Sequence, residues 1–307
     1  MLPRFDNPAL RPLADAALLP GRLAFTTDSF VVKPLCFPGG DIGKLAICGT
    51  VNDLAVSGAR PQWISCGLII EEGFHLDQLE QIIESMAQTA RSVGAQIVTG
   101  DTKMVERGNA DGLYINTAGV GQMHNGFEPT DPRPGDAILV SGPIGDHEAA
   151  IFQARQQIAE RLDVASDCAA LWPLVEAMMA HAGDIRVMRD PTRGGLATVL
   201  CEIASRCGYS MELDEAAVPV RSEVRGLCEL VGFDPLYMAC EGRLLAAVAP
   251  DAAESILDIM RHHPLGGGAA IVGRVLDERK GKTYLKTAIG GGRILRMLAA
   301  GQLPRIC

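Results

Sequence analysis

Segments typical of β-strands alternate with segments typical of α-helices along the whole sequence, and one turn-rich cluster interrupts them. Apolar side chains at 76, 79, 82, 83, 86 and 90 have the spacing of an amphipathic helix over 76–93. Short apolar runs such as 62–70 and 113–121 are typical of strands. The cluster 128–135 holds three prolines and a glycine, which favours a turn there. This alternation restricts the chain to an α/β or α+β fold.

The expected elements fall into two sets on either side of that turn. The strands are expected at 22–33, 62–70, 96–100, 113–121, 137–141, 185–189, 209–213, 243–249, 269–275 and 282–286. The helices are expected at 43–58, 76–93, from about 146, 169–182, 194–206, 222–230 and 251–263. Because 307 residues suffice for two hydrophobic cores, we expect an N-terminal domain over 1–133, a C-terminal domain over 134–300 and a mobile tail over 301–307.

Bulk composition excludes several classes of function. A formal net charge of −9 and a sequence pI near 5.2 argue against a nucleic-acid surface. No apolar stretch approaches the length of a membrane span, and the start of the chain does not resemble a signal peptide. The nine cysteines are odd in number and contain no C-x-x-C pair, which favours reduced thiols in a cytoplasmic protein.

Four aspartates occupy similar settings, each at an expected strand end or sharp turn beside small residues: Asp28, Asp53, Asp101 and Asp190. Carboxylates at strand ends converge easily in a cleft, where several together hold a hard cation such as Mg²⁺. Each aspartate alone also fits a structural role, because aspartates make turns and cap helices. Asp190 in particular could cap the helix expected at 194–206.

Conventional nucleotide-binding motifs are absent from the sequence. The segment Pro38-Gly39-Gly40-Asp41-Ile42-Gly43-Lys44 superficially resembles a phosphate loop, but the Walker pattern requires glycine at 38 and serine or threonine at 45. Those positions hold Pro38 and Leu45. If the protein uses ATP, it does so through metal ions and glycine-rich turns.

Three further residues are candidates for chemistry. Lys103 follows Asp101 by two positions, and Glu241 precedes an apolar strand, so both could handle protons; a solvated lysine and a turn carboxylate are the structural alternatives. Cys307 is the last residue of the sequence, at the end of Gly301-Gln302-Leu303-Pro304-Arg305-Ile306-Cys307. A thiol there has more reach than one in a core, and thiols are strong nucleophiles.

Taken in order, these motifs resemble the HypE family of hydrogenase maturation proteins, within the AIR synthetase-like ATP-binding superfamily. The matching stretches span nearly the whole chain: 26–29, 37–46, 52–59, 69–74, 98–103, 115–119, 189–195 and the terminal Pro304-Arg305-Ile306-Cys307. Selenophosphate synthetase and AIR synthetase share the acidic motifs without this tail. Family members usually begin with a His/Gly-rich segment, and none precedes Asp28 here.

The resemblance implies a two-domain fold, a homodimer formed through N-terminal domains, and an activity. A carbamoyltransferase, HypF, would load Cys307, and ATP-dependent dehydration would turn the S-carbamoyl group into a thiocyanate. A HypC–HypD complex would accept the cyanide for the iron of a nickel–iron hydrogenase. The implied roles are Mg²⁺ binding by Asp28, Asp53, Asp101 and Asp190, nucleotide contacts by Asn52, Asp101, Thr192 and Arg193, and proton or charge handling by Lys103 and Glu241.

Two other functions remain open at this stage. A sister enzyme could phosphorylate a small molecule, as selenophosphate synthetase does, with Cys307 irrelevant. A scaffold without catalysis could deliver its tail to a maturation complex. Removal of the last four residues would leave activity intact only in the sister enzyme. ATP hydrolysis in the presence of the carbamoylating partner would exclude the scaffold.

Overall fold

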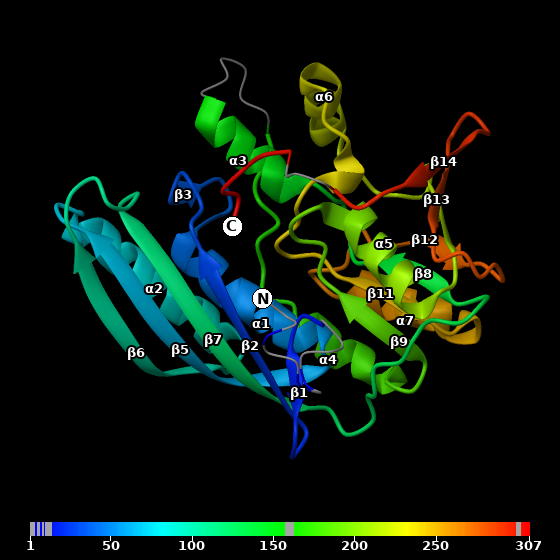
Figure 1. The fold of residues 1–307 in the computed structure, drawn as a ribbon, viewed down its shortest axis with the longest axis horizontal. Coiled ribbons are helices and arrows are strands. Elements are labelled where there is room, and N and C mark those ends of the chain that lie inside the picture. The colour runs from blue at the N-terminus through cyan, green and yellow to red at the C-terminus, as the bar shows by residue number, and fades with distance from the viewer. Residues whose placement is uncertain (1–3, 5–6, 8, 10–13, 157–162, 299–301) are drawn as a thin grey trace.

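Two separate β-sheets, one from each half of the chain, organise the fold in the computed structural model (Figure 1). The structure describes residues 4, 7, 9, 14–156, 163–298 and 302–307. The first sheet has the order β1-β2-β7-β5-β6. Its strands are β1 (Ala17–Leu19), β2 (Leu23–Phe30), β5 (Ala59–Glu71), β6 (Gln96–Val105) and β7 (Leu113–Met123). Only β5 and β6 are parallel; the other pairs are antiparallel.

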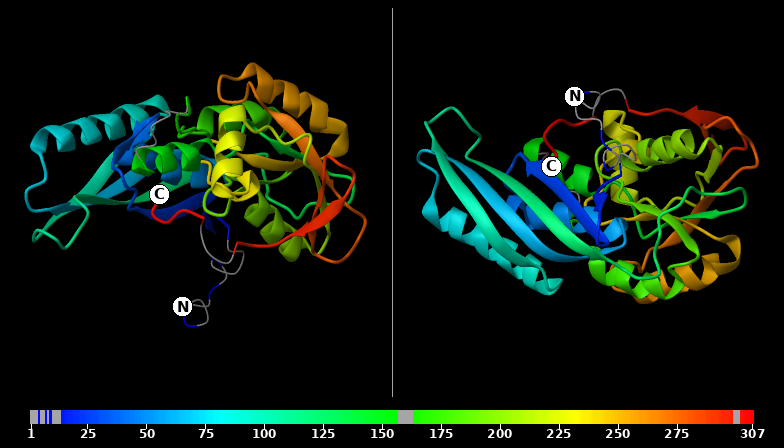
Figure 2. Two further views of the ribbon diagram at one scale, coloured as in Figure 1. Left: turned by 90° about the horizontal axis from the view of Figure 1, so that it is seen from above. Right: turned by 60° about the horizontal axis from the view of Figure 1, so that its bottom comes forward.

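Helices cover one face of this first sheet and leave the other face bare. The helices are α1 (Ile42–Val56) and α2 (Leu76–Ser92), and Figure 2 shows both on the same side. Within the described chain, no helix lies against the opposite face. A two-stranded hairpin of β3 (Cys36–Phe37) and β4 (Gly40–Asp41) leads into α1. The side chain of Asp41 caps this helix by accepting from the Gly43 and Lys44 amides.

The second sheet has the order β14-β13-β10-β12-β8-β11-β9. Its strands are β8 (Ala137–Val140), β9 (Ile185–Arg189), β10 (Met211–Asp214), β11 (Leu245–Val248), β12 (Ala270–Val275), β13 (Thr283–Lys286) and β14 (Gly292–Leu295). The helices of this half are α3 (Asp146–Gln156), α4 (Trp172–Met178), α5 (Gly195–Cys207), α6 (Ser222–Val231) and α7 (Ala253–His262). Short 3₁₀ turns are η2 (Met179–His181), η3 (Pro235–Tyr237) and η4 (Pro250–Ala252).

Helix α1 lies at the junction of the two halves, where it contacts β2, β5 and β7 on one side and α4 and β9 on the other. Thirteen of its 15 residues are buried, and the exceptions are Lys44 and Asp53. Gly49 allows close packing, since a methyl group there would come within 2.7 Å of the Phe30 ring. Asp53 is the carboxylate of this helix, and even its partial burial carries a cost unless other groups compensate its charge.

The expected α/β architecture is confirmed, and the expected strands and helices all occur with boundaries shifted by a few residues. The predicted helix over 169–182 is shorter, because α4 covers only Trp172–Met178 before η2. Three features were missed: β1, the β3–β4 hairpin and β14, all too short for a clear apolar period. The proposed division at 133/134 falls between the last strand of the first sheet and the first strand of the second.

The end of the chain lies in the space between the two halves, beside β2 and α3 (Figure 1). Residues 302–307 are described in a docked position, with Ile306 buried. The mobility of this tail therefore stays a prediction. Across the described residues, the structure contains no helix with the length and apolar character that a bilayer crossing requires.

Candidate functional site

Three carboxylates meet at the junction between the halves. Asp15 precedes β1, Asp53 lies on α1, and Asp190 follows β9 directly. One oxygen from each lies within 4.8 Å of the others. The Thr26 hydroxyl donates to Asp53 Oδ2 at 2.6 Å, and Arg189 Nε lies 2.5 Å from Asp15 Oδ2. Three acidic groups with one arginine leave an excess of negative charge, which suits a divalent cation with oxygen ligands.

Burial, followed by repulsion between the carboxylates, raises the pKa values of this group. Burial raises the pKa of Asp190 to about 7, and the Asp15 carboxylate adds to the rise. Burial followed by repulsion from Asp190 and Asp15 raises the pKa of Asp53 well above its usual range. Burial and mutual repulsion both disfavour the ionised carboxylates, and a bound cation would offset both effects.

Asp28 lies on β2 and faces the same junction. Its side chain shares the sheet face of Thr26 and Phe30, and it lies over Gly49 of α1. Desolvation raises its pKa, while the backbone amide of Ser29 and the charge of Arg193 oppose the rise. After burial, repulsion by Asp28 is among the causes that raise the pKa of Asp190. Asp28, Asp53 and Asp190 are thus brought together.

Glu241 occupies the inner wall of the junction and is only 2% exposed. Its Oε1 atom is buried without a hydrogen-bond partner among the described atoms. Burial, then repulsion from Asp190 and Asp167, raises the pKa of Glu241 well above its usual range. Its backbone is fixed, because the Glu241 amide donates to Asp167 Oδ1 at 3.1 Å. An orphaned buried carboxyl oxygen beside the acidic group is a candidate proton acceptor.

The Cys307 thiol lies in this same junction. Arg193 Nη2 donates to Cys307 Sγ at 3.2 Å. Burial and then the Glu241 charge raise the pKa of the thiol to about 11, although Arg193 opposes the rise. Asp28 also contributes to it, so the sulfur lies within the field of the acidic group.

The loop from Asp190 to Gly194 carries two predicted contacts. The Thr192 amide donates to the Asp190 carbonyl at 3.0 Å, which folds the loop into a tight turn. Gly194 has a φ of 86°, a left-handed conformation that suits glycine, and α5 begins at the next residue. The turn leaves Arg193 exposed and within reach of the tail.

Asn52 binds the backbone of the second half, and its role toward a nucleotide stays a prediction. Its side-chain Nδ2 donates to the carbonyls of Ala169 and Glu241 at 3.0 and 3.1 Å, and its Oδ1 accepts from the Leu171 amide at 2.8 Å. Both amide protons are therefore taken up by backbone of the second half. In this geometry Asn52 fastens the two halves together and presents no free donor to a nucleotide.

Asp101 and Lys103 lie apart from the acidic group within a single chain. One row of paired residues crosses the sheet from β2 through β7 and β5 to β6, and it consists of residues 28, 117, 66 and 100. Three strand spacings place β6 roughly 14 Å from β2. Asp101 pairs in the next row with Gly67, on the bare face of the sheet, whereas Asp28 faces α1. Both side chains are about two-thirds exposed, and they pair with each other at 2.8 Å.

Sequence reasoning missed three residues. Asp15 belongs to the acidic group but has no local motif that links it to Asp53 or Asp190. His147 and Arg155 both lie on α3, and neither was among the candidate residues. Both contact the tail. Nothing in the sequence reveals contacts between segments about 150 residues apart.

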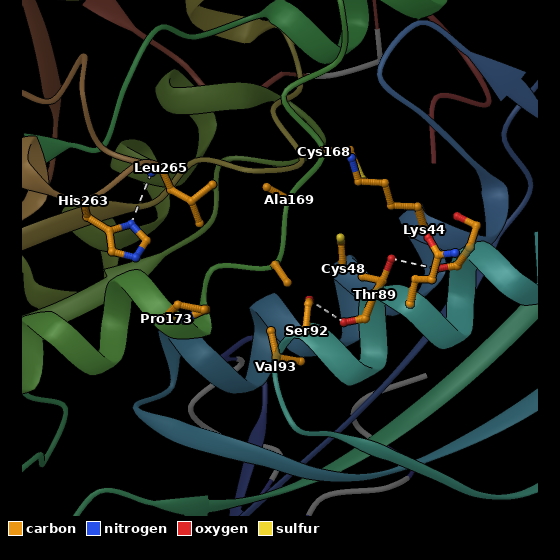
Figure 3. Close-up of a pocket in the computed structure, with 13 residues that line it drawn as sticks. Lys44, Cys48, Thr89, Ser92, Val93, Cys168, Ala169, Pro173, His263 and Leu265 are labelled. Carbon is orange, nitrogen blue, oxygen red and sulfur yellow. Dashed lines mark hydrogen bonds between the residues drawn. The ribbon is translucent and has the colours of Figure 1, made fainter.

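A separate groove of about 540 Å³ lies between α1, α2 and the loop before α4 (Figure 3). Its walls include Lys44, Cys48, Cys168 and His263. The Lys44 ammonium is held by the Gly39 carbonyl at 2.9 Å. None of its described lining residues is among the predicted site residues. The groove is therefore separate from the acidic junction.

Comparison with known proteins identifies the family. The AIR synthase related N-terminal domain matches residues 13–123, and the AIR synthase related C-terminal domain matches residues 133–286. The chain therefore belongs to the AIR synthase related family.

Within that family the chain belongs with the HypE hydrogenase maturation proteins. It is 52% identical over 299 residues to a protein named carbamoyl dehydratase HypE from Rhodobacter capsulatus, covering 96% of this chain and 88% of that one. It matches a crystal structure of HypE in complex with ATP with a TM-score of 0.89 at 48% identity, covering 100% and 94% of the two chains. A HypE–HypF complex matches with a TM-score of 0.92 at 44% identity, covering 96% of each.

Proposed function

We propose that the protein is an ATP-dependent carbamoyl dehydratase that acts on its own Cys307. An S-carbamoyl group on this cysteine is dehydrated to a thiocyanate, which supplies the cyanide ligands of iron in nickel–iron hydrogenase maturation. The observation that carries this proposal is the position of Cys307 Sγ, 3.2 Å from Arg193 Nη2 and within the field of Glu241 and Asp28. The relatives named carbamoyl dehydratase support the same activity.

The acidic group fits the magnesium complex of ATP. Asp53 and Asp190, with Asp28 and Asp15 beside them, offer carboxylate oxygens whose pKa values are raised by burial and then by repulsion from neighbouring carboxylates. The nucleotide supplies a phosphoryl group that makes the carbamoyl oxygen a good leaving group, so oxygen departs as phosphate and nitrogen gives up both protons. We assign Arg193 and the Thr192 turn to the stabilisation of anionic oxygens.

Glu241 is the residue that we assign to proton removal. After burial, the Glu241 charge is the next cause that raises the pKa of the Cys307 thiol, which supports a role for this carboxyl group toward a group carried on the sulfur. Its own raised pKa makes the ionised carboxylate a stronger base than an ordinary glutamate. The fixed Glu241 backbone holds the base in position during the reaction.

A second copy of the chain completes this proposal. The bare face of the first sheet exposes Phe25, Trp63 and Ile69, each by 40–46%. Such apolar side chains on an open sheet face favour burial against another subunit. Asp101 and Lys103 lie on that face. In a homodimer they would face the partner, where we assign Asp101 to metal or nucleotide binding and Lys103 to the phosphoryl charge.

Partners and compartment follow from the same proposal. A carbamoyltransferase of the HypF type loads Cys307, and the HypE–HypF complex of a relative supports this pairing. A HypC–HypD complex accepts the cyanide. We place the reaction in the cytoplasm, which the nine free thiols of the structure support.

Intact-mass spectrometry tests the proposal. The protein is incubated with its carbamoylating partner and carbamoyl phosphate, and then with ATP and Mg²⁺. We expect an adduct on the C-terminal peptide that loses the mass of water only after ATP is added. Cys307→Ala should keep the fold and ATP binding and lose both mass changes. Dehydration of a protein-bound carbamoyl group by this variant would overturn the assignment.

Two outcomes would favour the alternative functions. Turnover of a small molecule after removal of residues 304–307 would favour the sister enzyme, and a complete lack of ATP hydrolysis would favour the scaffold.

A further inference from the structure

The docked tail is held by its main chain at four consecutive residues. The Pro304 oxygen accepts from Arg155, and the Arg305 oxygen accepts from Arg155 and from the Lys33 amide. The Ile306 oxygen contacts His147 Nε2 at 2.7 Å. The Cys307 main-chain oxygen accepts from the Val31 amide at 3.1 Å. Every main-chain oxygen from 304 to 307 thus has a partner.

Two of these bonds join the tail to the segment that directly follows β2. The Val31 amide donates to Cys307 and the Lys33 amide donates to Arg305, so the residue numbers run in opposite directions along the two segments. The tail thus lies antiparallel to this segment, with one hydrogen bond at every second residue. The tail is therefore aligned along its length, and the position of Cys307 follows from the register of Arg305.

Helix α3 binds the other main-chain oxygens of the tail through His147 and Arg155. His147 is fully buried, and its ring meets the edge of Phe37 at 5.5 Å between centroids. Because the Ile306 oxygen can only accept, His147 Nε2 carries the proton, and Nδ1 at 2.8 Å accepts from the Ser166 hydroxyl in the neutral ring. Burial lowers the pKa of His147, which favours this neutral form.

Arg155 lies two turns further along α3 and connects this helix to the segment after β2 and to the tail. Its guanidinium donates to the carbonyls of Lys33, Pro304 and Arg305. A planar guanidinium with five donors can serve three acceptors at fixed angles, which an ammonium cannot do with the same geometry. Arg155 therefore ties the segment after β2 to the tail while His147 fixes the residue before the cysteine.

We propose that His147 and Arg155 of α3 are positioning residues that dock the tail through its main-chain oxygens and so place Cys307 in the acidic junction. This inference rests on the proposed function, because it assigns the docked tail as the reacting state. Side chains of the tail are recognised as well: Ile306 is 4% exposed, Arg305 pairs with Asp111, and the Gln302 and Cys307 side chains bind Asp234 and Arg193. None of these main-chain bonds uses the Cys307 sulfur, so a substituent carried on the sulfur does not remove them.

Hydrogen exchange of the Val31 and Lys33 amides tests the docking without ATP or partner. In the full chain we expect both amides to be protected, and removal of residues 304–307 to abolish that protection. His147→Leu, which keeps the volume but not the donor, should speed their exchange about tenfold, the effect of one lost hydrogen bond. His147→Gln, which keeps an N–H donor, should restore most of it. Gln156→Ala, on the exposed end of α3, is the matched control and should change nothing.

Arg155→Met and Arg155→Lys form an independent arm if the buried His147 variants do not fold. Methionine should release both amides, and lysine should restore only part of the protection. Single-turnover dehydration of chain carbamoylated beforehand should slow in the variants with faster exchange, with ATP affinity unchanged. The inference would be overturned if the full and truncated chains exchanged these amides at equal rates. It would also be overturned if His147→Leu and Arg155→Met exchanged them at the rate of the unmodified chain. If docking is confirmed and dehydration never occurs, the proposed function fails and the docking stands.

Discussion

Arg193 donates a hydrogen bond to the Cys307 thiol, and this contact joins the loop after β9 to the last residue of the sequence. The pKa of that thiol is nevertheless raised to about 11 by burial and by Glu241. A protonated thiol is a poor nucleophile, so the docked sulfur is chemically quiet at neutral pH. The docked position therefore suits a group already carried on the sulfur, and loading requires the tail to leave the junction.

This contrast predicts slow alkylation of Cys307 in the docked chain. With iodoacetamide at pH 8, we expect Cys307 to react more slowly than the exposed Cys36, and its rate to keep rising with pH toward 11. His147→Leu should accelerate labelling of Cys307 and leave Cys36 unchanged. Peptide mass mapping distinguishes the two sites, and equal rates in the unmodified chain would contradict the buried, protonated state.

Replacement of Glu241 separates proton transfer from binding. Glu241→Gln keeps the side-chain volume and the backbone contacts but removes the base. We expect dehydration of the S-carbamoyl group to fall by roughly 10²–10⁴-fold, a usual range for loss of a general base. Binding of ATP and the exchange protection of Val31 should persist. A variant with normal dehydration would assign the proton to another residue.

Asn52 is expected to act on stability and not on nucleotide affinity. Asn52→Ala leaves the Leu171 amide and two carbonyls without their partners at a buried position. The free energy of unfolding should fall by about 2–4 kcal/mol, with the same loss in the presence and absence of Mg²⁺ and ATP. Urea denaturation measures both, with exposed Gln88→Ala as a control that should stay within about 0.5 kcal/mol. A loss that appears only with ATP would restore the nucleotide role.

Local patterns in the sequence were sufficient for the elements and for part of the site. Asp28, Asp53 and Asp190 were predicted from strand ends and small neighbours, and tertiary structure brings them together. Asp15 and His147 could not be found in this way, because their roles depend on contacts across many residues of chain. Asp101 illustrates a different limit, since its side of the sheet is set by strand register, which a run of residues does not reveal.

Glu148 predicts a pH-dependent stability that is independent of the acidic group. Burial raises its pKa from 4.5 to about 7, even though the Ala239 amide donates to Glu148 Oε2 at 2.8 Å. A raised folded-state pKa gives stability that is present below pH 4.5 and is lost as pH rises through 7.

Glu148→Gln keeps an oxygen for the Ala239 amide and cannot ionise. Relative to the unmodified chain, the variant should gain on the order of 3 kcal/mol between pH 5 and pH 8. Other titrating groups shift both proteins equally, so the difference isolates Glu148. Urea denaturation at the two pH values provides the test, and parallel pH profiles would contradict a buried, ionisable Glu148.

The position of Asp101 and Lys103 predicts that active sites are shared between subunits. Lys103→Met and Cys307→Ser should each be inactive alone, because one lacks the phosphoryl-charge contact and the other the carrier sulfur. If Lys103 serves the tail of the partner, a mixed dimer has one complete site, built from the Cys307 of the first variant and the Lys103 of the second. Random mixing should then restore about one quarter of the unmodified dehydration per subunit. A second mixture, of Lys103→Met with Glu241→Gln, tests which residues share a chain. Glu241 and the tail beside it belong to the same chain, so this mixture should also recover activity. A mixture that stays inactive while size measurements confirm exchange of subunits would place Lys103 in the site of its own chain or outside catalysis.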